Sequence, residues 1–388
     1  MIGSTGVGKT EIARRLARMM SLPFIKVEAS KYTEVGFVGR DVESMIRDLV
    51  NVSINLVKKE HKEKNKQNIE AYVQKTIVEK LLPPLPKGAT QEKEDSYIKS
   101  FQKMQKRLED GELDTLTVEV EIKQGVGEME DGAMPPEMMK VQESIMKIIS
   151  LKTESIKKEV SVKEAKDILK LEASEKLLDF DKVKAEAVER VENGGIVFID
   201  EIDKIAVSTK SQSRQDPSKE GVQRDLLPLV EGSEVSTKYG VIKTNHILFI
   251  SAGAFHLVKP SDLIPELQGR FPLRVELSSL SEESLYQILT KPKNSLLKQY
   301  KALLKVEGVE LEFEDDAIRA VSKISQLANE KLEDIGARRL HTVVERLLEE
   351  ISFEADEKSG EKIVVTKELV HKRLDEVASD EDVSRYIL

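Results

Sequence analysis

Hydrophobic and polar residues follow two spacings along the chain, one typical of helices and one typical of strands. Between residues 11 and 20 the apolar positions fall on one helix face. Residues 24–29 then alternate as a strand does, and residues 42–50 return to the helical spacing. A helix that connects two strands of one sheet predicts a βαβ start with a parallel sheet.

The character of the chain changes at residues 55–189, where Lys and Glu dominate. Residues 116–122 alternate like an exposed strand, residues 125–136 predict a flexible linker rich in Gly and Met, and residues 165–173 carry another helical stripe. The charge runs predict solvated faces. We expect an inserted, partly mobile domain that carries no catalytic constellation.

Later segments predict further strands of the sheet and then a helical region. Ile196 to Ile199 form a run of apolar residues, which suits a strand buried on both faces, and residues 246–251 predict a third strand. After about Leu280 the spacing is mostly helical. The predicted fold is α/β, with a discontinuous parallel-sheet domain at residues 1–55 and 190–279, an inserted, mostly helical domain at 56–189, and a smaller, mainly helical domain at 280–388.

Composition narrows the class of protein. The 388 residues leave room for two or three domains. A net charge of −9 argues against a general nucleic-acid binder, whose footprint is usually basic. No stretch predicts a membrane span or a signal peptide, and the absence of cysteine fits a reducing compartment, so a cytoplasmic protein is expected.

The chain begins with the pattern G-x-x-x-x-G-K-[ST], a P-loop whose fixed positions are Gly3, Gly8, Lys9 and Thr10. Glycines let successive backbone N–H groups face one anion, and the following helix adds its positive N-terminal end. Lys9 then suits the β- and γ-phosphates, and Thr10 suits Mg²⁺. An ordinary glycine-rich turn is disfavoured because every fixed position is filled. The predicted nucleotide-binding residues are Gly3, Ser4, Thr5, Gly6, Val7, Gly8, Lys9, Thr10 and Glu11.

An acidic pair, Asp200 and Glu201, follows the apolar run at residues 196–199. The carboxyl ends of strands are where open α/β sheets place ligands. In a P-loop enzyme Asp200 would hold the Mg²⁺ shell and Glu201 would polarise the attacking water. A strand that simply ends in a helix cap is the alternative, which the P-loop makes less attractive.

Three other polar residues are candidates with alternatives. Ser251 ends the third predicted strand, where it could contact the γ-phosphate or only cap the strand. Arg270 lies in a glycine-proline setting that predicts a loop arginine; it could stabilise a phosphoryl transition state in trans or form a surface salt bridge. Arg338 lies at the predicted start of a helix and is free to reach a nucleotide.

Two segments suggest contacts with other chains. Gly36 and Gly39 bracket Phe37 and Val38, which predicts either a mobile loop with an exposed apolar pair or a tight turn with Phe37 in the core. The acidic stretch after residue 379 ends in apolar residues, which either pack on their own domain or insert into a partner.

Only Met1 and Ile2 precede the P-loop, whereas a strand needs about five or six residues to span a sheet. We therefore expect an upstream segment that this chain lacks.

The order of these motifs resembles that of the AAA+ ATPases. Within that group the chain closely resembles the HslU (ClpY) family of Clp/Hsp100 unfoldases, the ATPase subunits of the bacterial HslUV protease. The resemblance covers nearly the whole chain and is weakest between about residues 55 and 150. The stretches that carry it are residues 3–17, 36–39, 199–205, 260–270 and 381–388.

The resemblance implies an ATP-dependent protein unfoldase that uses ATP and Mg²⁺ and is not itself a peptidase. It implies that Lys9 and Thr10 serve nucleotide and Mg²⁺, and that Asp200 and Glu201 form the Walker B pair. Arg270 would be the arginine finger that reaches a neighbouring subunit. Arg338 would be the sensor arginine that couples nucleotide state to domain angle.

The resemblance also implies partners. The chain would form a homohexameric ring and act on unfolded or tagged proteins as a stress-response chaperone. The acidic balance and the lack of a membrane span predict neither a nucleic-acid nor a membrane partner. Phe37 stands where the family usually has Tyr, which keeps an aromatic grip and loses a hydroxyl. The implied pore-lining residues are Gly36, Phe37, Val38 and Gly39, and the residues implied to dock into an HslV-type peptidase are Tyr386, Ile387 and Leu388.

The chain departs from the family pattern in three places. The family has an N-terminal segment before the P-loop. Its Ala-Ser-Gly after the sensor strand stands here as Ser251-Ala252-Gly253, which leaves the role of Ser251 open. The inserted domain diverges, which leaves substrate choice open.

Other functions remain as alternatives. A ClpX-type unfoldase would pair with another peptidase. A nucleic-acid-remodelling AAA+ ATPase is disfavoured by the acidic balance. An inactive nucleotide-binding scaffold is the third.

Overall fold

The computed structural model describes residues 1–33, 40–83, 91–123, 155–207 and 217–379. Contacts divide the chain into two compact units, one of Met1–Ile54 with Ala187–Leu388 and the other of Asn55–Glu186. Each unit contains hydrophobic core residues of its own. Among the described residues, none of the helices combines the length and the apolar character that crossing a membrane requires.

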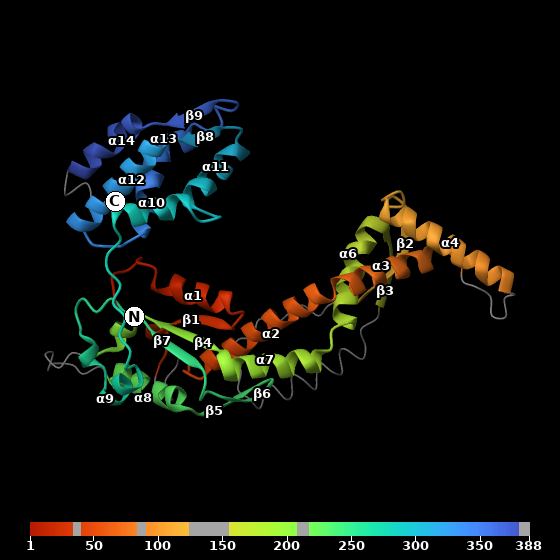
Figure 1. The fold of residues 1–388 in the computed structure, drawn as a ribbon, viewed down its shortest axis with the longest axis horizontal. Coiled ribbons are helices and arrows are strands. Elements are labelled where there is room, and N and C mark those ends of the chain that lie inside the picture. The colour runs from red at the N-terminus through yellow and green to blue at the C-terminus, as the bar shows by residue number, and fades with distance from the viewer. Residues whose placement is uncertain (34–39, 84–90, 124–154, 208–216, 380–388) are drawn as a thin grey trace. The chain divides into compact units, whose positions relative to one another are not determined.

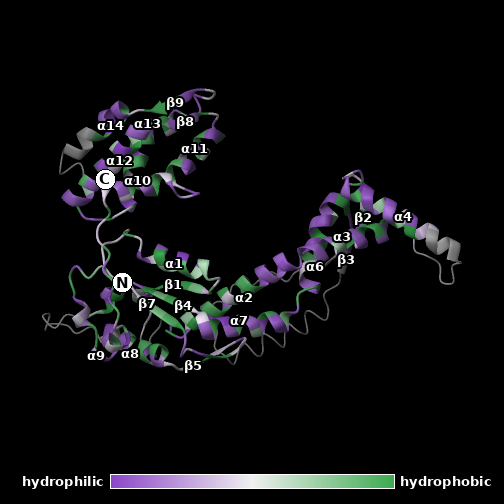
Figure 2. Cartoon of the chain, in the orientation of Figure 1, coloured by the Kyte–Doolittle hydropathy of each residue, from purple (hydrophilic) through white to green (hydrophobic). Residues whose placement is uncertain are grey.

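The first unit contains a three-stranded parallel sheet in the order β1 (Phe24–Glu28), β4 (Ile196–Asp200) and β7 (Leu248–Ser251) (Figure 1). The predicted parallel α/β sheet is confirmed. Its register sets Glu28 beside Asp200 and Ile199 beside Ser251, so the strands end together. The apolar residues of β4 are buried on both faces, and Figure 2 colours β4 and β7 as hydrophobic.

Helices and short strands surround this sheet. In α1 the small residues Ala13 and Ala17 are buried, which lets the helix lie close to β1 and β4. Besides α1 (Lys9–Met19), this part of the chain contains α2 (Ser44–Lys64), α7 (Phe180–Gly194), α8 (Pro217–Glu231), α9 (Pro265–Arg270), the hairpin of β5 (Glu234–Thr237) and β6 (Gly240–Lys243), and the 3-10 turns η1 (Ala29–Lys31), η2 (Ile202–Ile205) and η3 (Pro260–Asp262). Both α2 and α7 continue into the second unit.

The chain after residue 280 is mainly helical, as predicted, and its core is built on the stripe of α13. Leu340, Val344 and Leu347 are buried there. A parallel pair of four-residue strands, β8 and β9, adds to it. The elements are α10 (Glu282–Thr290), α11 (Leu296–Val306), β8 (Glu310–Phe313), α12 (Asp315–Lys331), α13 (Arg338–Phe353), β9 (Lys362–Val365) and α14 (Lys367–Ser379).

The second unit combines helices with an antiparallel strand pair. The expectation of an exposed strand at residues 116–122 is wrong for one face, because Val118 and Val120 of β2 are buried in the core of this unit. The predicted linker at residues 125–136 lies outside the described residues. The elements are α3 (Lys66–Leu81), α4 (Gln91–Glu109), β2 (Thr117–Lys123), β3 (Ser155–Ser161) and α6 (Val162–Lys176).

Candidate active site

The glycines of the P-loop adopt the backbone conformation that the motif requires. Gly6 and Gly8 have φ of 79° and 102°, in the left-handed region that side chains disfavour. The α1 helix begins directly afterwards, at Lys9. The loop therefore leads into a helix N-terminus, where backbone N–H groups bind anions.

The Lys9 side chain is buried within this loop. Its Nζ donates to the carbonyl oxygens of Gly3 at 2.6 Å and Ser4 at 2.8 Å. Burial lowers the pKa of Lys9, the nearby carboxylates of Asp200 and Asp203 act in the opposite direction, and Arg338 lowers it further. A cation thus lies where the loop would hold phosphate oxygens.

Thr10 and Asp200 come together although they are far apart in the sequence. Thr10 Oγ1 lies 3.5 Å from Asp200 Oδ2, because α1 and the end of β4 meet at this edge of the sheet. A hydroxyl and a carboxylate are the oxygen donors that Mg²⁺ takes in nucleotide sites, where it keeps few protein ligands. The two residues therefore fit the predicted role of holding Mg²⁺.

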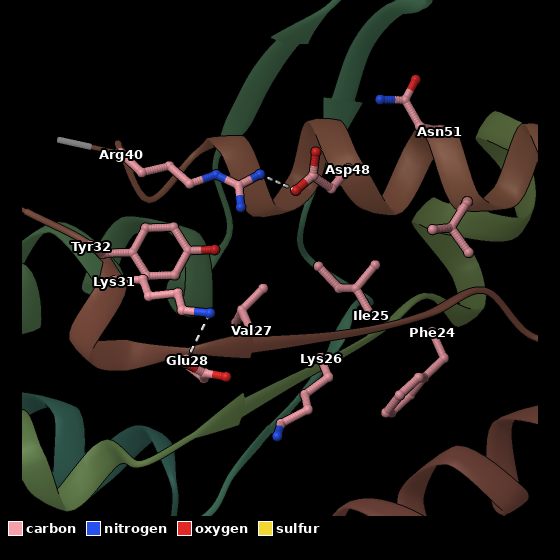
Figure 3. Close-up of a pocket in the computed structure, with 11 residues that line it drawn as sticks. Phe24, Ile25, Lys26, Val27, Glu28, Lys31, Tyr32, Arg40, Asp48 and Asn51 are labelled. Carbon is pink, nitrogen blue, oxygen red and sulfur yellow. Dashed lines mark hydrogen bonds and ion pairs between the residues drawn. The ribbon is translucent and has the colours of Figure 1, made fainter. Parts of the chain in front are cut away.

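A lysine that sequence reasoning missed contacts the same carboxylate. Lys26 Nζ lies 2.9 Å from Asp200 Oδ2. Figure 3 shows Lys26 on one side of β1 and Ile25 and Val27 on the other. The alternation of β1 was visible in the sequence, but the register with β4 that brings Lys26 to Asp200 was not.

Glu201 follows Asp200 in a left-handed conformation, with φ 58° and ψ 34°. Its Oε2 accepts hydrogen bonds from Lys204 Nζ at 2.7 Å and Ser30 Oγ at 3.3 Å, while its backbone N–H donates to Asp200 Oδ1 at 3.0 Å. The two carboxylates thus have different partners, Thr10 and Lys26 for Asp200 and Ser30 and Lys204 for Glu201, which fits a metal role for one and a water role for the other. Neither Ser30 nor Lys204 was predicted.

The turn that follows β7 contacts another acidic residue, Asp203. Asp203 Oδ2 accepts a hydrogen bond from the Phe255 N–H at 3.2 Å, and a Cβ at Gly253 would lie 2.8 Å from Asp203 Oδ1. Ser251, one strand over, is half-buried. Its sensor role stays a prediction.

The turn before α13 packs directly on the P-loop. The Ala337 N–H donates to the Gly6 carbonyl at 3.1 Å, and a Cβ at Gly6 would lie 2.1 Å from the Ile335 carbonyl oxygen. Arg338 is the first residue of α13, as predicted, and its exposed side chain is close enough to Lys9 to influence the pKa of that lysine.

Hydrogen bonds hold this turn in place. Burial alone would raise the pKa of Asp334, but hydrogen bonds from Ser279 Oγ at 2.6 Å and the Gly336 N–H at 3.0 Å outweigh it, and the pKa is lowered. The buried Arg339 donates to Asn329 Oδ1 at 3.2 Å and to the Glu333 carbonyl at 2.8 Å. These hydrogen bonds were not predicted from the sequence.

The prediction of a loop arginine at residue 270 is wrong. Arg270 is the last residue of α9, a short helix that begins at Pro265. Within the chain its guanidinium pairs with Glu231, with Nη2 2.7 Å from Oε1. This is the surface salt bridge that the sequence analysis gave as the alternative.

A cavity of about 510 Å³ lies beside β1. Figure 3 shows its lining, which includes Tyr32, Arg40 and Asp48. Burial raises the pKa of Tyr32 to about 12, and Arg40 pairs with Asp48. Tyr32 and Arg40 also form a β-bridge across the segment predicted to line a pore. That segment, with Gly36, Phe37, Val38 and Gly39, and the predicted docking residues Tyr386, Ile387 and Leu388 lie outside the described residues.

Comparison with known families gives the same class of protein. Residues 1–82 match the family model described as ATPase family associated with various cellular activities (AAA), and residues 114–274 match the AAA domain (Cdc48 subfamily). With the P-loop, Asp200 and Glu201 at the ends of parallel strands, the fold and the site define an AAA+ ATPase.

Relatives then narrow the class to one family. The chain is 62% identical to the ATP-dependent protease ATPase subunit HslU of Campylobacter jejuni subsp. jejuni serotype O:2, over all of this chain and 88% of that protein. It is 63% identical to the protein of the same name from Helicobacter pylori strain G27, over all of this chain and 87% of that protein. The chain belongs to the HslU family of AAA+ ATPases.

Proposed function

We propose that this chain is the ATP-hydrolysing subunit of an HslUV-type protease, which unfolds proteins and passes them to a separate HslV-type peptidase. The observation that carries the proposal is the meeting of Lys9, Thr10, Asp200 and Glu201 at one sheet edge in a member of the HslU family.

The site residues divide the work of ATP hydrolysis. Loop N–H groups and Lys9 bind the phosphates and orient them. Thr10 and Asp200 would hold Mg²⁺, which when bound neutralises charge on the transferred phosphoryl group. Glu201 accepts the proton of the attacking water, and its hydrogen bonds from Ser30 and Lys204 set its orientation until that water is in place.

Two arginines complete the proposal. Arg270 leaves Glu231 to reach the nucleotide of a neighbouring protomer, and Arg338 senses the γ-phosphate beside Lys9. A homohexameric ring supplies the neighbour. Residues 36–39 grip the substrate in its pore, residues 386–388 dock into the peptidase, and the assembly works in the cytoplasm. Ser251 acts as a sensor of the nucleotide.

Peptidase activation tests this function. With ATP and Mg²⁺ the chain is expected to stimulate an HslV-type peptidase and to unfold a tagged substrate, and a chain that ends at Arg385 should hydrolyse ATP without stimulating the peptidase. The Glu201→Gln variant should lose ATP-dependent unfolding. ATP hydrolysis without any binding or stimulation of the peptidase would contradict the coupling, and stimulation that survives removal of residues 386–388 would point to a ClpX-like mode of docking.

A further inference from the structure

One carboxylate oxygen of Asp200 has two partners within the chain. Asp200 Oδ2 lies 2.9 Å from Lys26 Nζ and 3.5 Å from Thr10 Oγ1. The oxygen that would face a magnesium ion is therefore already paired with an ammonium group of the same chain.

The register of β1 with β4 brings the Lys26 ammonium to the Asp200 carboxylate. Lys26 lies in the middle of β1, paired in register with Phe198 of β4, and β4 ends two residues later at Asp200. The rings of Phe24 and Phe198 pack on each other with centroids 6.3 Å apart, which adds a side-chain contact between the two strands. The lysine stem therefore starts from a fixed backbone position.

Both partners are partly shielded from water. The Lys26 side chain is 33% exposed and the Asp200 side chain 19% exposed, unlike the neighbouring pair of Lys31 and Glu28, whose lysine is 66% exposed. An ion pair is screened less when its members are partly buried. Lys26 therefore has a larger effect on its carboxylate than an ordinary surface lysine has.

We propose that Lys26 competes with Mg²⁺ for Asp200 and thereby sets the magnesium concentration at which nucleotide binds tightly. The proposal rests on the proposed function only in taking Asp200 as a magnesium residue. A divalent ion bound close to Oδ2 would lie within a few ångströms of the ammonium, and like charges at that separation repel. Lys26 must therefore withdraw from Asp200 before Asp200 can serve the metal.

Competition between Lys26 and Mg²⁺ predicts the direction in which the magnesium requirement changes when Lys26 is replaced. Removal of the ammonium frees Asp200, so less magnesium is needed. If Lys26 instead held Asp200 in the geometry that the metal requires, its removal would raise the magnesium requirement. The two roles predict opposite shifts of one measured quantity.

The test uses a fluorescent ADP analogue and the full chain. Its binding is measured at fixed nucleotide while Mg²⁺ is titrated, for the wild type and for Lys26→Met, Lys26→Arg and the matched control Lys31→Met, which removes a lysine from the pair with Glu28. We expect the half-saturating Mg²⁺ concentration of Lys26→Met to fall roughly tenfold, the equivalent of about 1.4 kcal/mol. Lys26→Arg keeps the charge and should stay within about threefold of the wild type, and Lys31→Met should not shift.

Nucleotide binding in EDTA shows whether each variant still has a folded P-loop. A higher Mg²⁺ requirement in Lys26→Met, or an unchanged one in a variant that still binds nucleotide in EDTA, would overturn the proposal. If Lys26→Met does not bind in EDTA, Lys26→Gln takes its place with the same expected shift. Failure of the wild type to bind nucleotide at any Mg²⁺ concentration would instead contradict the proposed function.

Discussion

At the scale of single residues, Gly6 shows how closely the P-loop and the turn before α13 lie. It has φ 79°, and a Cβ there would lie 2.1 Å from the Ile335 carbonyl oxygen. Gly8 has φ 102°, but a Cβ there would meet nothing within 4 Å. A side chain at either glycine would strain the backbone, but only a side chain at Gly6 would also collide with neighbouring atoms.

We expect Gly6→Ala to destabilise the nucleotide-free protein more than Gly8→Ala does. Both substitutions place a side chain in a left-handed conformation at a cost of roughly 1–3 kcal/mol, but only Gly6→Ala also pushes the 335–337 turn away. Thermal unfolding without nucleotide measures the difference. Equal losses of Tm would show that the contact with Ile335 contributes nothing.

Sequence reasoning found the site residues that belong to a local motif and missed those that depend on register. Lys9, Thr10 and Asp200 were predicted because a fixed spacing or a strand end carries them. Lys26 and Ser30 contact the acidic pair only because β1 lies in register beside β4, and no spacing along the chain encodes that contact.

At the scale of elements, the turn at residues 333–337 owes its shape to a buried guanidinium. Arg339 donates to Asn329 and to the Glu333 carbonyl, and Asn329 donates in turn to the Gly336 carbonyl at 3.0 Å. These hydrogen bonds hold the turn against the P-loop. Loss of the Arg339 guanidinium should therefore destabilise both the turn and the P-loop.

Arg339→Met is expected to lower the free energy of unfolding by about 2–3 kcal/mol, because it leaves the buried Asn329 Oδ1 and the Glu333 carbonyl without this donor. The control is Arg346→Met on the same helix, which removes an exposed pair with Glu349 and should cost less than about 1 kcal/mol. Urea unfolding followed by circular dichroism measures both. Similar midpoints for the two variants would contradict a supporting role for Arg339.

Elements with a clear hydrophobic pattern were predictable, and short elements without one were not. β1 alternates, β4 and β7 are runs of apolar residues, and α13 carries a helical stripe. β5, β6, β8 and β9 have four residues each that mix polar and apolar types, too few to show a period. The six-residue helix α9 was missed because Gly269 and Pro272, which lie on either side of Arg270, predicted a loop. The buried face of β2 depends on packing within its unit.

At the scale of the whole molecule, the proposed ring would divide the catalytic residues between neighbouring protomers. Glu201 would act in the protomer that binds ATP and Arg270 would come from the next one, whereas within a single chain Arg270 is paired with Glu231. An arginine finger supplied by a neighbour is worth roughly 10³- to 10⁵-fold in rate. Neither Glu201→Gln nor Arg270→Ala alone should therefore hydrolyse ATP appreciably, although both should bind it and assemble.

Mixing these two inactive variants tests the central claim most directly. In randomly mixed rings about a quarter of the sites pair an intact Glu201 with an intact Arg270 from the neighbour, so an equimolar mixture is expected to recover about that fraction of the wild-type ATPase rate. Arg274→Ala, at an exposed arginine four residues further along the chain, serves as the control for Arg270→Ala and should hydrolyse ATP by itself. A mixture that assembles and exchanges subunits but stays as inactive as its components would contradict hydrolysis shared between protomers.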